Sequence, residues 1–250
     1  MARQSRPLSA ARTILLTRPA SQSARFADEL RSVLAEVDIV AAPLMVPQFL
    51  MPMIPARKFA AIVLTSETGA EAARRISAAG VKLPDLAYCV GDRTAFAASG
   101  AGFHAVSANG NAANLVGDLV TRGVSGPLLH VRGKDSRGNV VENLNSAGIE
   151  TFSVIAYDQR EQPVSAEMRS VLRGTKPVLV PLFSPRSARM FAEKAMAAGT
   201  TAPLMIVALS VAVARELAPL VPDRIAIAAG PGGAAMIEAI IALINDDSGS

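Results

Sequence analysis

The stretch SVIAYDQREQ, residues 153–162, decides the predicted fold together with VDIVAAPLMV, residues 37–46. Both are rich in β-branched and apolar side chains, which favour strands, and each closes a region of alternating helices and strands. Four prolines between residues 43 and 55 exclude a helix there and disfavour a central strand. We therefore predict that the two stretches are paired hinge strands through which the chain passes between two lobes.

The rest of the chain alternates short apolar runs with segments at helical spacing. The predicted strands are 13–17, 60–66, 86–91, 103–107, 127–133, 149–157, 177–184, 204–210 and 224–230, and the predicted helices are 21–35, 67–79, 92–99, 111–120, 137–146, 165–172, 185–197, 211–218 and 233–244. This alternation predicts an α/β fold with parallel sheets and helices on both sheet faces.

An internal repeat divides this pattern into two similar lobes. LTSETGAEAARR resembles FSPRSARMFAEK, which aligns Ser66 with Ser184, and LLHVRG resembles ILLTRP, which aligns Arg132 with Arg18. The offsets, roughly 114 to 121 residues, suit a duplicated lobe and are too long for a solenoid repeat. We predict a discontinuous α/β lobe, residues 1–40 plus 160–250, and a continuous α/β lobe, residues 41–159, that includes the hinge strands.

Composition and charge narrow the class of partner. Half of the 250 residues are apolar and 18% are charged, as in globular proteins, and no apolar run reaches the roughly 18 residues that span a bilayer. The net charge is only +4, aromatic residues make up 4%, and the basic residues are scattered. A nucleic-acid surface needs a basic stripe with interleaved aromatic residues, so we expect neither nucleic acid nor membrane as partner. A mildly basic chain suits a cleft for an anionic small molecule.

The single cysteine and the leader bear on the compartment. Cys89 lies inside an apolar run and has no partner for an internal disulfide, which fits a reducing compartment such as the cytoplasm. The leader, residues 1–12, is basic and rich in serine, but the apolar run after it is too short for a signal peptide. We interpret it as a frayed terminus, and a remnant of an organelle transit peptide is the alternative.

Hydroxyl residues and arginines occur at the carboxyl ends of the predicted strands, where helix N-termini present free N–H groups. Ser66, Ser184 and Ser210 hold such positions, and Arg18 and Arg132 stand at two others. Each serine alone could be an ordinary helix N-cap. Together, on two facing lobes, they indicate a cleft that holds carboxylates through backbone N–H, hydroxyl and arginine contacts.

Common catalytic and cofactor motifs do not occur in the sequence. Gly230-Pro-Gly-Gly lacks the G-x-G-x-x-G spacing of a dinucleotide site, and we interpret it as a flexible turn. His104 and His130 lie in apolar strands without neighbours at metal-ligand spacing, so we interpret both as packed strand residues and expect no metal or cofactor. Cys89 is in mid-strand and no G-x-S-x-G elbow exists, so a hydrolase triad has no candidate nucleophile.

Tyr157, one of two tyrosines in the chain, lies on the second hinge strand. It could simply fill the seam between the lobes. A phenol is also a neutral proton donor at pH 7, suited to help a hydroxyl group leave. The residues alone leave both roles open.

Several short motifs follow one another in order along nearly the whole chain. They are TRP at 17–19, LTS at 64–66, VGDRTA at 90–95 with Gly100, VRG at 131–133, Tyr157, and FSPRSARMF at 183–191. This ordered set resembles the uroporphyrinogen-III synthase family. The resemblance implies two α/β lobes joined by a two-strand ladder, with the N-terminal unit completing the C-terminal lobe.

The resemblance also implies an activity, that of a lyase without cofactor. Its substrate would be hydroxymethylbilane, a linear tetrapyrrole with acetate and propionate groups, which closes to uroporphyrinogen III with inversion of ring D and loss of water. Tyr157 matches the family tyrosine proposed to assist departure of the hydroxyl, which makes it the predicted catalytic residue. The residues that match cleft-facing turn positions of the family are Ser66, Thr94, Arg132 and Ser184. The full predicted substrate-binding set is Arg18, Ser66, Thr94, Arg132, Ser184, Ser187 and Ser210.

The chain departs from the family at one turn. The family usually has Gly-x-Thr-Thr-Ala in the second lobe, whereas this chain has Ser210-Val-Ala-Val-Ala. Ala212 and Val213 replace the two threonines, so no role of those threonines transfers, although Ser210 could substitute for them.

The remaining predictions concern partners, oligomeric state and an alternative class of protein. The substrate could be handed over by hydroxymethylbilane synthase, and we expect a monomer because no exposed heptad or large apolar stripe is visible. The alternative is a two-lobed sensory module that closes around a small anion without catalysis.

Overall fold

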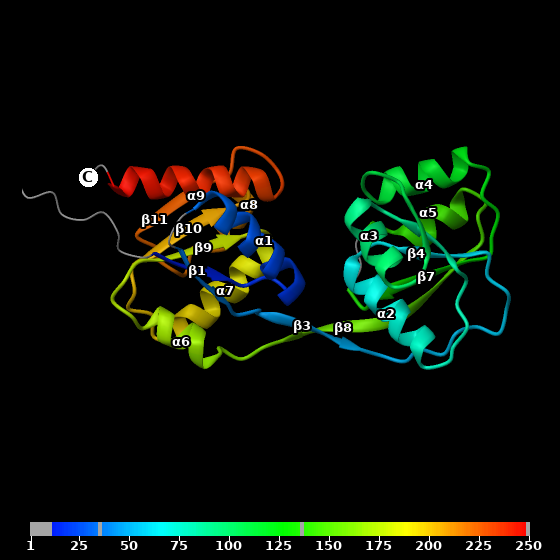
Figure 1. Cartoon of the computed structure of the whole chain (residues 1–250), viewed down its shortest axis with the longest axis horizontal. Coiled ribbons are helices and arrows are strands. Elements are labelled where there is room, and N and C mark those ends of the chain that lie inside the picture. Colours follow the sequence, from blue (N-terminus) through cyan, green and yellow to red (C-terminus); the bar gives the residue numbers. More distant parts are fainter. Residues whose placement is uncertain (1–11, 35–36, 136–137, 249–250) are drawn as a thin grey trace, which may run out of the picture. The chain divides into compact units, whose positions relative to one another are not determined.

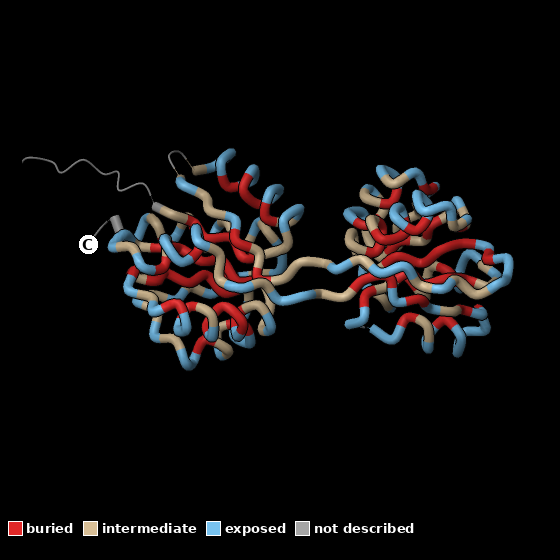
Figure 2. Tube along the Cα trace, turned by 90° about the horizontal axis from the view of Figure 1, so that it is seen from below, coloured by how far each residue is buried: buried red, intermediate tan, exposed pale blue. Residues whose placement is uncertain are grey.

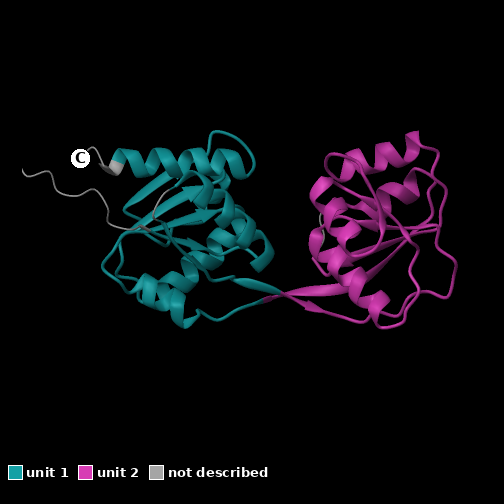
Figure 3. Cartoon of the chain, viewed as in Figure 1, with its two compact units in different colours: residues 1–46, 161–250 teal, residues 47–160 magenta. Residues whose placement is uncertain are grey.

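The computed structural model describes residues 12–34, 37–135 and 138–248. Nearly all of the leader, residues 1–11, lies outside them, so both interpretations of it stay predictions. Contacts group the chain into two compact units, residues 1–46 with 161–250 and residues 47–160, called unit 1 and unit 2 below (Figure 3). Within the described part of the chain, the helices are too short or too polar to cross a membrane.

Unit 1 is built on a parallel sheet with strand order β11-β10-β9-β1-β2 (Figure 1). Its strands are β1 (Arg12–Leu16), β2 (Val37–Ala41), β9 (Val178–Leu182), β10 (Leu204–Ala208) and β11 (Arg224–Ile227), and its helices are α1 (Ala20–Val33), α6 (Ala166–Leu172), α7 (Pro185–Ala197), α8 (Val211–Arg215) and α9 (Gly233–Ser248). One apolar core, which contains Phe191, lies between the sheet and α6, α7 and α8. The other, which contains Phe26 and Ile240, lies between the sheet and α1 and α9.

Unit 2 is built on a sheet with strand order β3-β8-β7-β4-β5-β6. Its strands are β3 (Met45–Phe49), which begins in unit 1, β4 (Ala61–Leu64), β5 (Leu86–Cys89), β6 (His104–Ser107), β7 (Leu128–Gly133) and β8 (Thr151–Glu161), and its helices are α2 (Glu67–Ala78), α3 (Asp92–Gly100), α4 (Ala112–Thr121) and α5 (Val140–Ser146). Helices α2 and α3 cover one face, where Ile62 is buried, and α4 and α5 cover the other, where Val63 is buried. The central strands of each unit are buried (Figure 2).

The two sheets repeat the same strand order. Strands β4, β5, β6, β7 and β8 of unit 2 correspond in position to β9, β10, β11, β1 and β2 of unit 1. Ser66 and Ser184 therefore follow matching strands, and Arg132 and Arg18 lie at the ends of another matching pair. This repeat accounts for the sequence similarity between the two halves of the pattern, because each half encodes the same parallel arrangement.

The prediction that residues 37–46 form a single hinge strand is wrong. Residues 37–41 are β2, a parallel edge strand of unit 1 that pairs with β1. The strand next to β8 is β3, which begins at Met45 because Pro43 interrupts the extended run. The Leu50 N–H donates to the Ala156 carbonyl and the Gln162 N–H to the Leu44 carbonyl, so β3 and β8 run antiparallel. An outermost strand tolerates Pro47 because one of its edges pairs with no other strand in the part of the chain that the structure describes.

Other predictions on single residues have mixed outcomes. His130 and Cys89 are buried as expected, and burial raises the pKa of the Cys89 thiol to about 12. His104 is exposed at the start of β6, so the prediction that it packs inside is wrong. The reason is its place on the outermost strand of the sheet, where a side chain has fewer neighbours.

Candidate active site

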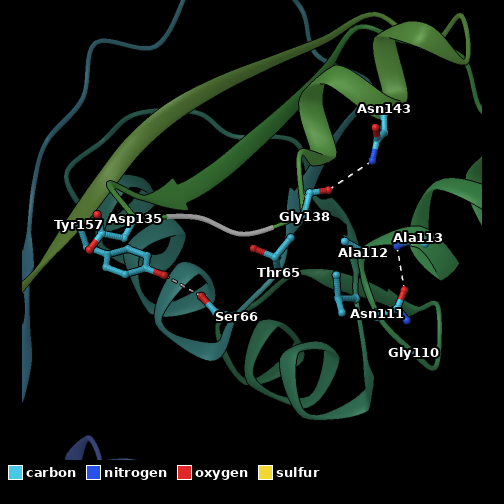
Figure 4. A pocket seen from close by; sticks show the side chains of 12 residues that line it. Thr65, Ser66, Gly110, Asn111, Ala112, Ala113, Asp135, Gly138, Asn143 and Tyr157 are labelled. Carbon is cyan, nitrogen blue, oxygen red and sulfur yellow. Dashed lines mark hydrogen bonds between the residues drawn. The ribbon is translucent and has the colours of Figure 1, made fainter. Parts of the chain in front are cut away.

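A cavity of about 710 Å³ lies at the carboxyl edge of the unit 2 sheet, a size usual for small-molecule sites. Its lining residues are Thr65, Ser66, Val90, Gly110, Asn111, Ala112, Ala113, Gly133, Asp135, Gly138, Asn143 and Tyr157 (Figure 4). They gather here because the carboxyl ends of parallel strands meet at one edge of a sheet. Helices α2 and α4 also begin at this edge and bring the positive ends of their dipoles to it.

A β-bulge in β8 turns Tyr157 toward the cavity. On β7, Arg132 lies opposite Ile155, but the next residue, Gly133, lies opposite Tyr157, so Ala156 is an extra residue in β8. Ala156 and Tyr157 are consequently both buried, although they are neighbours in a strand. Without the bulge, strand alternation would direct Tyr157 away from the face on which Val154 and Ala156 pack.

The Tyr157 hydroxyl contacts Ser66, the N-cap residue of α2. The two oxygens, Tyr157 Oη and Ser66 Oγ, are 2.9 Å apart, and either can donate (Figure 4). Ser66 Oγ also accepts a hydrogen bond from the Gly69 backbone N–H at 3.0 Å. The serine is therefore an ordinary N-cap and at the same time a partner of the cavity tyrosine.

Gly133 leaves the space in which the Tyr157 ring lies. A Cβ atom on Gly133 would be 2.7 Å from Tyr157 Cε2 and Cζ, which is closer than non-bonded carbon atoms approach one another. The tyrosine ring thus packs directly on the backbone of the neighbouring strand. The Lys134 N–H also donates to the Tyr157 carbonyl at 2.9 Å, which holds the backbone of the tyrosine at this point.

Beside this pair, Thr65 contacts His130 on β7. Thr65 Oγ1 and His130 Nε2 are 3.3 Å apart, and the other ring nitrogen, Nδ1, is buried and has no hydrogen-bond partner among the described residues. Burial, reinforced by the positive charge of Arg132, lowers the pKa of His130 to about 4, so the ring is neutral at pH 7. A packed histidine was predicted here, but its contact with a cavity residue was not.

The cavity lining carries one charged side chain, Asp135, among its described residues. Arg132, on β7, donates hydrogen bonds from Nη1 to the carbonyl groups of Gly133 and Lys134, at 3.0 and 3.1 Å. Lys134 is exposed, with Nζ 3.9 Å from Asp158 Oδ2. Hydroxyl and amide side chains therefore supply most of the polar lining. In the part of the chain that the structure describes, no cluster of residues is suited to hold a metal ion.

Of the predicted site residues, only Ser66 and Tyr157 line this cavity. Arg132 lies near it on β7, while Thr94 is buried in α3 and is not among the lining residues. Among the described residues of the loop after β7, Asp135 and Gly138 line the cavity, and Ser136 and Arg137 lie outside the described residues.

The remaining predicted residues belong to unit 1. Ser184 and Ser187 cap α7 reciprocally, each hydroxyl serving the other's backbone N–H. Arg18 places its guanidinium 3.9 Å from the centre of the Phe183 ring, next to Ser184. Ser210 is an exposed N-cap of α8. These residues stand at the carboxyl edge of the unit 1 sheet.

Sequence reasoning missed Gly133, Asn111 and Asn143 as site residues. Asn111 is the N-cap of α4, and its side chain accepts from the Ala113 N–H at 2.8 Å. Asn143 lies on α5 and donates to the Gly138 carbonyl at 3.3 Å (Figure 4). The asparagine before a helix could have been recognised as a turn residue, whereas Asn143, inside a predicted helix, gives no such signal.

The fold and the cavity define a mostly parallel α/β protein with a small-molecule site at strand ends. Residues 24–238 match the family described as uroporphyrinogen-III synthase HemD. The chain belongs to the uroporphyrinogen-III synthase family, and the resemblance predicted from its motifs is confirmed.

The chain is similar to solved structures of uroporphyrinogen-III synthases. The uroporphyrinogen-III synthetase of Helicobacter pylori 26695 is 14% identical, with a TM-score of 0.62 over 93% of this chain and 99% of that one. A mutant uroporphyrinogen III synthase of the extremely thermophilic bacterium Thermus thermophilus is 13% identical over 94% of this chain and 100% of that one, with a TM-score of 0.47. No curated protein matches the sequence. The first likeness confirms the predicted α/β class.

The contact between Gly133 and Tyr157 predicts the effect of one methyl group. Gly133→Ala should destabilise the fold by about 1–3 kcal/mol in urea unfolding, because the tyrosine ring must move away from the new Cβ. Gly117→Ala is the matched control. Gly117 lies in α4 with nothing near its Cβ position, and the change should stabilise by about 0.5–1 kcal/mol. Equal stability of the two variants would contradict the close packing.

The buried His130 predicts a loss of stability in acid. Its folded-state pKa, about 4, lies below the ordinary 6.5, so the unfolded chain binds a proton that the folded chain excludes. The contribution is intact above pH 6.5 and falls as the pH decreases toward 4, by about 2 kcal/mol between pH 7 and pH 5. Urea unfolding of His130→Gln should lack this part of the pH dependence. His104→Gln, at an exposed position, should retain it.

Proposed function

We propose that this chain is a uroporphyrinogen-III synthase that converts hydroxymethylbilane to uroporphyrinogen III and water, a cyclising carbon–oxygen lyase reaction. Family membership and the α/β fold support this activity. The observation that carries the proposal is the hydrogen bond between Ser66 and Tyr157 at the wall of the cavity. No finding favours the sensory alternative.

The direction of this hydrogen bond decides whether Tyr157 can act as an acid. Ser66 Oγ accepts from the Gly69 N–H, and either oxygen of the Ser66–Tyr157 pair can donate; in the arrangement that we propose, Ser66 donates to Tyr157 Oη. The tyrosine hydrogen is then available to a ligand in the cavity. If the phenol gives up its proton, the Ser66 O–H and the N-terminal end of the α2 dipole both stabilise the phenolate.

The proposed reaction begins with the departure of the hydroxyl group from ring A. Tyr157 donates its proton, the carbon–oxygen bond breaks, and water leaves, while ring A becomes an electrophilic azafulvene. Ring D attacks the azafulvene through its substituted carbon and forms a spiro intermediate. The bond from that carbon to the ring C bridge then breaks, which leaves an azafulvene on ring C, and the free α-carbon of ring D bonds to this bridge in the inverted orientation. The proton lost from ring D when aromaticity returns balances the one that Tyr157 gave. The chain's main task is to hold the ends of the substrate in this geometry.

We propose that units 1 and 2 are the two lobes of this enzyme. Tyr157, Ser66 and Arg132 would serve the reacting end in unit 2. Carboxylates of the substrate would also bind to hydroxyl, backbone and guanidinium donors of unit 1. The predicted residues Arg18, Ser184, Ser187 and Ser210 supply these donors. Thr94 is the weakest candidate of the predicted substrate-binding residues because it is buried in α3. Activity as a monomer in the cytoplasm, with substrate received from hydroxymethylbilane synthase, belongs to the same proposal.

The product isomer tests the activity directly. Freshly generated hydroxymethylbilane should close to the type III isomer in the presence of the protein, and to type I in buffer alone. Oxidation to porphyrins followed by chromatographic separation measures the ratio. If only type I forms at high protein concentration, the chain lacks this activity.

Tyr157→Phe tests the role of the phenol. Removing the donor should lower kcat about a hundredfold, at the lower end of general acid catalysis, with only the loss of one hydrogen bond, about 1 kcal/mol, in stability. Tyr88→Phe is the matched control, since Tyr88 is the chain's only other tyrosine and does not line the cavity. Equal kcat in the two variants would reduce Tyr157 to a packing residue.

A further inference from the structure

Thr65 directly follows β4, and His130 lies on the neighbouring strand β7. Val63 of β4 lies opposite His130 of β7, so Thr65, two residues further along the chain, points to the same face. His130 is 2% exposed, whereas Thr65 reaches the cavity. Their 3.3 Å contact therefore joins a buried ring to a hydroxyl that a ligand can reach. In Figure 4 the Thr65 hydroxyl points toward the side on which Tyr157 lies.

The neutral imidazole has two tautomers, and they differ in whether the buried Nδ1 is a donor or an acceptor without a hydrogen-bond partner. If Nδ1 carried the hydrogen, a buried N–H donor would have no acceptor among the described residues, and Nε2 would accept a hydrogen bond from the Thr65 hydroxyl. If Nε2 carries it, His130 donates to Thr65 Oγ1 and only a lone pair on Nδ1 stays unmatched. Buried donors without acceptors are rarer than acceptors without donors, which favours the second tautomer.

The second tautomer has a consequence for the cavity. Because Thr65 accepts from His130, its own O–H hydrogen must find an acceptor elsewhere, and the accessible space is the cavity. The described lining contains no lysine or arginine. Neutral hydroxyl and amide groups are the side-chain donors of the described lining, and a pre-oriented hydroxyl is a strong donor to a carboxylate.

We propose that Thr65 donates a hydrogen bond to a carboxylate of the substrate, and that His130 is the positioning residue that orients this hydroxyl. The identity of the substrate rests on the proposed function. Tyr157 serves the departing hydroxyl, whereas Thr65 binds a side group equally in the ground state and in the transition state. Its loss therefore raises KM and leaves kcat largely unchanged.

The tautomer can be tested without any activity assay. The chain has two histidines, so ¹⁵N-histidine labelling of the His104→Gln variant leaves His130 as the only signal in long-range ¹H–¹⁵N spectra. At pH 7 the spectrum should show a protonated Nε2 and an unprotonated Nδ1. A protonated Nδ1, or a doubly protonated ring, would overturn the inference whatever the protein catalyses.

Substitution of Thr65 tests the donor. Thr65→Val keeps the shape of the side chain and removes the hydroxyl, so KM for hydroxymethylbilane should rise about tenfold or more, with kcat within about twofold. Thr65→Ser restores the hydroxyl and should restore most of the affinity. An unchanged KM in Thr65→Val, or an equal rise in both variants, would contradict the proposed donor.

His130 variants separate positioning from packing. His130→Leu should raise KM several-fold, and His130→Gln, whose amide N–H can replace Nε2–H, should recover part of it. The double variant His130→Leu with Thr65→Val should have the same KM as Thr65→Val alone, because both substitutions act on the same donor, the Thr65 hydroxyl. Additive losses would indicate a general structural effect of His130 and overturn its role. Failure of the proposed function appears separately, as type I product from the unaltered chain.

Discussion

The packing of the Tyr157 ring on the backbone of Gly133 is the constraint on which the candidate site depends. It requires a strand residue without a Cβ atom and a β-bulge that turns the tyrosine to the buried face. Only then does the phenol reach Ser66 at the start of α2. Two adjacent parallel strands and one helix N-terminus are thus fixed against each other by a single side chain.

The chemistry of the cavity lining suits an electrophilic intermediate. An azafulvene would alkylate a free amine or a thiolate, which are the strong nucleophiles among side chains. The described lining contains neither lysine nor cysteine, and the single cysteine, Cys89, is buried with a raised pKa. Hydroxyl and amide groups can bind carboxylates without reacting. The one charge in the described lining, on Asp135, is of the sign that stabilises positive charge developing on the pyrrole rings.

The fold was largely predictable from the sequence because most strands are apolar runs and several helices start at a cap residue such as Ser66 or Ser184. The hinge was predicted less well, since residues 37–46 read as one extended run although the structure divides them into β2 and β3. The bulge at Ala156 has no local sequence signal, because it depends on the pairing of β7 with β8. For the same reason the contact of His130 with Thr65, between residues far apart in the chain, could not be predicted.

The repeat predicts that Ser66 and Ser184 are equivalent, yet their hydroxyl groups have different partners. Both are N-caps, but the third residue of the helix is Gly69 in α2 and Ser187 in α7. Ser187 completes a capping box, and its Oγ is 2.9 Å from Ser184 Oγ. Gly69 has no side chain to do this, and a Cβ there would be 3.1 Å from the Val131 carbonyl oxygen and 3.3 Å from Ser66 Oγ. The glycine therefore leaves the Ser66 hydroxyl available to Tyr157, so the hydroxyl at the same N-cap position contacts Ser187 in unit 1 and belongs to the proposed acid in unit 2.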